Sequence, residues 1–107
     1  MPAPVYSTQL VVISSAALGT QALFTARPDH VTVVRDVSIR SPGANATIDL
    51  YVSAGSQNAT FIHVVATGIQ VDHWDGRVVM NPGDILFAAT GVAGHQIIIS
   101  GYELTLV

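Results

Sequence analysis

The side chains of this 107-residue sequence that could support metal or acid–base chemistry are four histidines and seven acidic residues. No two histidines are two residues apart, the spacing that puts two ligands on one face of a strand, or four apart, as on a helix. Asp72, His73 and Asp75 are close in sequence, but they adjoin an expected turn, where polar residues gather for backbone reasons. The histidines are His30, His63, His73 and His95. The local spacing therefore predicts no metal site and no cofactor.

Motifs for catalysis are also missing from the sequence. Ser100 lacks the preceding glycine pattern of a nucleophile elbow. Asp72, Asp75 and Asp84 could be imagined as the paired carboxylates of a glycoside hydrolase, yet all three lie at expected turns. Residues 91–94 lack the lysine and the following helix of a phosphate-binding loop. We therefore expect no catalytic residue and a protein that is not an enzyme.

The composition excludes several classes of partner. Half of the residues are hydrophobic and only 10% are charged, against roughly 25% in ordinary soluble domains. With four arginines and no lysine, the chain has no basic patch for phosphates, so we expect no nucleic-acid partner. No run of about 18 apolar residues occurs, so we expect no membrane span. The first ten residues lack the features of a signal peptide, and we expect Met1 to begin the mature protein.

The elements that must position any site are expected to be strands. Val, Ile and Thr supply 33 residues, whereas Glu and Lys together supply only Glu103. Val, Ile and Thr favour strands, whereas Glu and Lys, which are nearly absent, are the residues that keep exposed helices soluble. Glycine and proline punctuate the chain at short intervals. The composition predicts an all-β protein.

Alternation of apolar and polar residues predicts about eight short antiparallel strands in one domain spanning residues 1–107, a jelly-roll-like β-sandwich. The expected strands are residues 9–14, 20–26, 31–40, 47–53, 60–66, 69–80 with an interruption at 75–76, 85–89 and 96–106. Residues 10–24 can alternatively be read as a short helix.

Details of the pattern predict how some of these strands pair. We expect residues 31–40 and 47–53 to form a hairpin around a turn at 41–45. Arg35 falls on the apolar face of its strand, which indicates a bulge near Val34 or a paired guanidinium. Residues 60–66 are apolar on both faces, as expected of a strand that is central or covered on its outer side.

Residues 81–84 carry a strong turn signal. They are Asn81, Pro82, Gly83 and Asp84. Proline fixes φ near −65° and glycine tolerates a positive φ, which are the requirements of a tight turn. We expect this turn to have a structural role.

Two segments of the second half carry a resemblance to a known family. Residues 74–84 read WDGRVVMNPGD, and residues 99–104 read ISGYEL. This pattern resembles small virion proteins of tailed bacteriophages, of the minor tail, tail-associated or head decoration type, over residues 60–107. The resemblance implies a structural role in an assembly and no active site. It makes Trp74, Tyr102 and Arg77 of the matching segments candidate interface or packing anchors.

The leading hypothesis is therefore a non-enzymatic component of a phage tail or capsid, made in the bacterial host cytoplasm. We expect a closed homo-oligomer of three-fold or higher symmetry that contacts other virion proteins, because the surface lacks the charges that keep isolated sheets apart. Two alternatives stay open. A carbohydrate-binding module would bind a host-surface glycan through Tyr51, Trp74 and Tyr102. A cupin-like metal enzyme would need three metal ligands brought together by folding.

Overall fold

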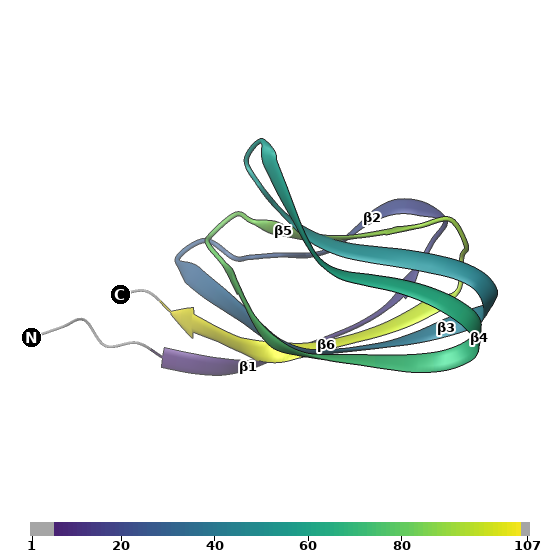
Figure 1. Ribbon diagram of the computed structural model, residues 1–107. Helices are drawn as coiled ribbons and strands as arrows, with labels where there is room; N and C mark the ends of the chain where they lie inside the picture. The colour runs from purple at the N-terminus through teal and green to yellow at the C-terminus, as the bar shows by residue number, and fades with distance from the viewer. Residues whose placement is uncertain (1–5, 106–107) are drawn as a thin grey trace, which may run out of the picture.

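A computed structural model describes residues 6–105, and these residues form a curled antiparallel sheet (Figure 1). The all-β prediction is confirmed, and residues 10–24 form strands rather than a helix. The six strands are β1 (Tyr6–Ala16), β2 (Gly19–Thr25), β3 (His30–Ala54), β4 (Gln57–Met80), β5 (Ile85–Thr90) and β6 (His95–Thr105). Within the described residues, no helix is long and apolar enough to cross a membrane.

The two long strands β3 and β4 connect the two layers of the sheet. Residues 30–40 of β3 pair with β6 on one side, and residues 71–80 of β4 lie on the other. Residues 48–53 of β3 pair with β5, again with β4 on the opposite side. β1 extends the sheet beyond β6, and β2 extends it beyond β5. The expected count of about eight strands is wrong, because β3 and β4 each run through both layers and the described residues form six strands. The curled sheet folds into a jelly-roll-like sandwich (Figure 1).

The predicted hairpin between residues 31–40 and 47–53 is wrong. The two runs belong to the single strand β3, which bends from one layer to the other at residues 41–45. Gly43 lies opposite Gly68 of β4 at this corner, and the pairing shifts between Ala44 and Ala46 around Asn45, whose φ is 59°. Proline, glycine and asparagine also serve bends and bulges within strands. β4 likewise continues without a break through Gly68 and through residues 75–76, where we expected one strand to end and another to be interrupted.

The expectation that residues 60–66 form a central strand is wrong as well. This half of β4 pairs only with β3 among the described strands, so it forms an edge rather than a centre. Ile62 and Val64 are buried against the other layer, but Val65 on the outer side is 57% exposed. The apolar character of both faces therefore does not correspond to burial on both faces within one chain.

One hydrophobic core fills the space between the layers. Alternate residues of every layer-forming strand point into it, as the period of two requires. Its largest members are Val37, Ile39, Ile97 and Ile99 of the first layer, with Ile48, Leu50, Ile62 and Leu86 of the second. Met80, where β4 ends, is also fully buried in this core.

The bulge that Arg35 predicts is confirmed. The pairing of β3 with both neighbours shifts between Val34 and Asp36, and Arg35 is exposed. Gly101 of β6 lies opposite this bulge, where an added Cβ would be 2.0 Å from the carbonyl oxygen of Val33. Backbone approaches backbone so closely there that only glycine fits.

The turn at residues 81–84 joins the two layers. Asp84 donates its backbone N–H to the carbonyl of Asn81 at 3.0 Å, and its carboxylate accepts from the backbone N–H of Asn81 at 2.9 Å. Gly83 has a φ of 88°. With Pro82 before it, this is the geometry of a type II turn.

Candidate functional site

The outer face of the first layer carries several strongly exposed apolar side chains. We define the first layer as β1, β6, residues 30–40 of β3 and residues 71–80 of β4. Ile13 of β1 is 77% exposed, and Val71 of β4 is 67% exposed. The exposed apolar residues on the layer and its corner are Val11, Ile13, Ile69, Val71, Val79 and Ile98, which we call the apolar face.

The members of the apolar face are connected across the strands. Ile13 and Ile98 are direct partners in the pairing of β1 with β6. They line a shallow hollow of about 380 Å³, and Ile98 with Val71 lines a second hollow of about 210 Å³. Arg40 lies in the second hollow and supplies a cation at its wall. The face therefore extends from the β1 edge to the β4 edge.

The outer face of the second layer is different. We define this layer as β2, β5, residues 46–54 of β3 and residues 57–66 of β4. Tyr51 stacks on Phe87 with ring centroids 5.3 Å apart and planes inclined by 16°. The side chains of Asp49 and His63 are joined by a hydrogen bond on the same layer. On this layer, the aromatic rings pack against each other and the polar groups bind each other.

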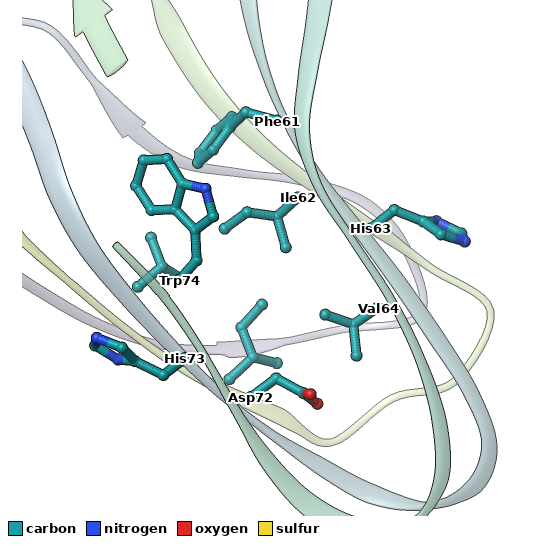
Figure 2. Close-up of a pocket in the computed structure, with 9 residues that line it drawn as sticks. Phe61, Ile62, His63, Val64, Asp72, His73 and Trp74 are labelled. Atoms are coloured by element: carbon teal, nitrogen blue, oxygen red, sulfur yellow. The ribbon is translucent and has the colours of Figure 1, made fainter. Parts of the chain in front are cut away.

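A cavity of about 260 Å³ opens at the β4 edge between the two layers (Figure 2). Val37, Ile39, Ile62 and Val64 form its apolar lining. Trp74 lies at one end, where its ring meets that of Phe61 edge-on at 5.1 Å. Asp72 also lines the cavity and accepts a hydrogen bond from the Gln70 amide at 2.8 Å.

The candidate anchors Trp74, Tyr102 and Arg77 are not brought together. We expected Trp74 and Tyr102 to approach each other, but β3 lies between β4 and β6 and separates them. Trp74 is half-buried and packs against the core, whereas Tyr102 lies opposite Val33. Arg77 is exposed on β4. Tyr51 belongs to the second layer, so Tyr51, Trp74 and Tyr102 share no stacking platform.

A cluster on the first layer escaped the sequence reasoning. Asp36 of β3 lies directly opposite Asp75 of β4, and one donor atom each from Asp36, His73 and Asp75 lies within 4.8 Å of the others. The sequence showed only the part of this cluster that lies on β4. The apolar face was also missed, although Ile97, Ile98 and Ile99 in succession signal a strand that is apolar on both faces.

No protein-family model and no curated protein matches the sequence. Among solved structures, a subunit of Bacillus endospore appendages, described as a family of disulfide-linked pili, has a TM-score of 0.60 at 14% identity over 96% of this chain and 89% of that chain. A pentameric capsid protein from metagenomic phage sequences has a TM-score of 0.48 at 19% identity, over 89% of this chain and 60% of that one. A protein of infectious bursal disease virus has a TM-score of 0.43 at 12% identity and is covered over 30% of its length. The pilus subunit shows that this fold occurs elsewhere.

Proposed function

We propose that this chain is a non-enzymatic structural subunit of a tailed-phage virion, a minor tail or capsid decoration protein, that assembles with copies of itself through the apolar face. The observation that carries the proposal is the exposure of Ile13, Ile98 and Val71, which line two hollows on the outer face of the first layer. Contiguous exposed apolar patches of this kind mark interaction surfaces in soluble proteins. Covering the face with another subunit removes it from water.

The sheet edges support the same role. β1 pairs only with β6 and β4 pairs only with β3 among the described residues, so both strands leave backbone groups free on one side. Isolated proteins usually protect such edges with lysine or other charged side chains. This chain contains no lysine, and its 11 charged residues are a small share of its length. An assembly that covers the edges needs no such protection.

The similarity to a pilus subunit fits a structural role, but the contact between subunits must differ. That family is described as disulfide-linked, whereas this chain contains no cysteine. Contacts between copies of this chain must therefore be noncovalent. The buried apolar area of the face then supplies the main driving force, at about 25 cal/mol per Å².

Light scattering coupled to size exclusion tests the proposal. We expect the purified chain to elute as an oligomer at tens of micromolar and the double variant Ile13→Asp/Val71→Asp to elute as a monomer that still melts cooperatively, at a lower temperature because association no longer stabilises it. Val65→Asp, on the second layer and 57% exposed, is the matched control and should stay oligomeric. A wild-type chain that is monomeric under these conditions contradicts the proposal.

Binding of a host-surface glycan is a second candidate function, and the cavity at the β4 edge favours it. Trp74 presents an aromatic ring there, and Asp72 and Gln70 offer polar groups for sugar hydroxyls. A glycan array of the wild-type chain, repeated with Asp72→Ala, tests this role. A signal that Asp72→Ala removes supports it, and the absence of any signal from the wild type contradicts it.

A further inference from the structure

Asp36, His73 and Asp75 form a compact set of donors on the outer side of the first layer. Asp36 and Asp75 are direct cross-strand partners, and Ser38 is the partner of His73. His73 and Asp75 are two residues apart on β4, so their side chains leave the strand on the same side. Figure 2 shows His73 directed away from the cavity between the layers.

The distances within this set suit a small metal ion. His73 Nε2 lies 3.4 Å from Asp36 Oδ1 and 4.0 Å from Asp75 Oδ2. Tetrahedral zinc with bonds of about 2.0 to 2.2 Å to nitrogen and oxygen places its donors about 3.3 to 3.6 Å apart. The first distance already fits. The second needs only a small rotation of the exposed Asp75 side chain.

Ser38 prepares the imidazole for this role. Its Oγ lies 3.1 Å from His73 Nδ1. When the hydroxyl accepts a hydrogen bond from Nδ1–H, Nε2 holds its lone pair toward the two carboxylates. Histidines that bind metals almost always have their second ring nitrogen hydrogen-bonded in this way, which fixes the tautomer and the ring orientation.

The charges of the cluster favour a cation between the carboxylates. Like charges directly opposite each other on antiparallel strands destabilise the pair. The ion pairs within the described residues give Asp36 and Asp75 one common partner, His73, and no arginine. The two carboxylates therefore face each other with no arginine beside them, and a divalent ion would offset their negative charge.

We propose that Asp36, His73 and Asp75 bind one divalent transition-metal ion of the zinc type, with water completing its coordination. An imidazole donor suits zinc and its neighbours in the first transition row. Calcium instead takes six to eight oxygen ligands, which is more than this set offers. The metal site does not rest on the apolar-face proposal, but it adjoins that face, because Ser38 lines the same hollow as Val71 and Ile98.

The second layer contains a natural control. His63 and Asp49 form an exposed histidine–aspartate pair, but this pair belongs to no cluster of three donors among the described residues. A surface imidazole that binds metal without a built site would do so at His63 as readily as at His73. Substituting each histidine in turn separates the two cases.

Isothermal titration of the tag-free full-length chain with Zn²⁺ tests the proposal, and Ca²⁺ serves as the contrasting probe. We expect one Zn²⁺ per chain, at least tenfold weaker binding in each of His73→Gln, Asp36→Asn and Asp75→Asn, and less than a twofold change in His63→Gln. We expect Ca²⁺ to bind at least tenfold more weakly than Zn²⁺.

A spectroscopic measurement shows where the ion binds and whether the variants fold. In ¹H–¹⁵N spectra of the imidazole rings, Zn²⁺ should shift the Nε2 resonance of His73 and leave that of His63 in place, and amide spectra should show all four variants folded. The proposal is overturned if the wild type binds no Zn²⁺, if His63→Gln weakens binding as much as His73→Gln, or if Ca²⁺ binds equally well.

Discussion

The two layers share the strands β3 and β4, yet they bury β3 differently. In the first layer, Thr32, Val33 and Val34 are buried in succession, so this part of β3 is covered on both faces. In the second layer, residues 48–52 alternate between buried and half-exposed side chains. The first layer is therefore crowded inside, and it is the layer whose outer face carries the exposed aliphatic side chains.

This difference indicates where substitutions should affect stability most. The crowded part of the first layer contains the bulge at Arg35, the close approach of Gly101, and Glu103, whose buried carboxylate accepts from Arg27 at 3.0 Å and 3.2 Å. Each of these features depends on residues far apart in sequence. The second layer also has irregular pairing, between Ala22 and Phe24 and between Leu50 and Tyr51, but residues 48–52 keep an alternation of buried and partly exposed side chains that tolerates single changes better. Stability should therefore be most sensitive in the first layer and least sensitive on the outer side of the second.

The largest effect is expected at Gly101. Gly101→Ala places a Cβ 2.0 Å from the Val33 carbonyl oxygen, so the strands around the bulge must move apart. We expect a loss of at least about 3 kcal/mol in the free energy of unfolding, at the upper end for overpacking. Gly68→Ala is the control, because an added Cβ there meets nothing within 4 Å and its φ is not positive. Urea denaturation of both variants measures the difference, and equal losses would break the contrast between crowded and open positions.

The next effect is expected where the layers meet at the cavity. Trp74→Ala removes a ring that packs edge-on against Phe61 of the second layer. A fully buried tryptophan loses about 3 to 5 kcal/mol on this change, and because Trp74 is half-buried we expect about 2 to 3 kcal/mol. Thermal melting of the subunit combined with light scattering checks this. A variant that keeps its melting temperature but loses its oligomeric state would make Trp74 an interface anchor instead.

Features of the fold and of the candidate sites were predictable where neighbouring residues in the sequence determine them. The β class follows from the excess of valine, isoleucine and threonine, and the bulge follows from one arginine on an apolar face. The corner at residues 41–45 was mistaken for a turn because proline, glycine and asparagine serve both, and only the pairing with Gly68 distinguishes them. The sequence did not reveal the role of Asp36 either, because that role has no local signal. Its place opposite Asp75 depends on a register set by the whole β3–β4 pair.

A smaller effect is expected at the turn that passes from the first layer to the second. Gly83→Val forces a β-branched residue to adopt a φ of 88°. We expect this strain to cost about 1 to 2 kcal/mol of unfolding free energy. Gly91→Val is the matched control in an exposed turn, since Gly91 has no positive φ and open space around it. Thermal melts that show the same shift for both variants would mean that φ does not decide the cost.

The smallest effect is expected on the outer face of the second layer. Tyr51 and Phe87 stack on neighbouring strands, and both remain partly exposed. A double-mutant cycle with Tyr51→Ala and Phe87→Ala should give a coupling energy of about 0.5 to 1 kcal/mol, within the range for stacked aromatic pairs. Because Gly101 and Tyr51 lie in different layers, the losses of Gly101→Ala and Tyr51→Ala should add when the two changes are combined. A coupling energy above about 2 kcal/mol, or losses that fail to add, would show that the outer side of the second layer is as constrained as the bulge of the first.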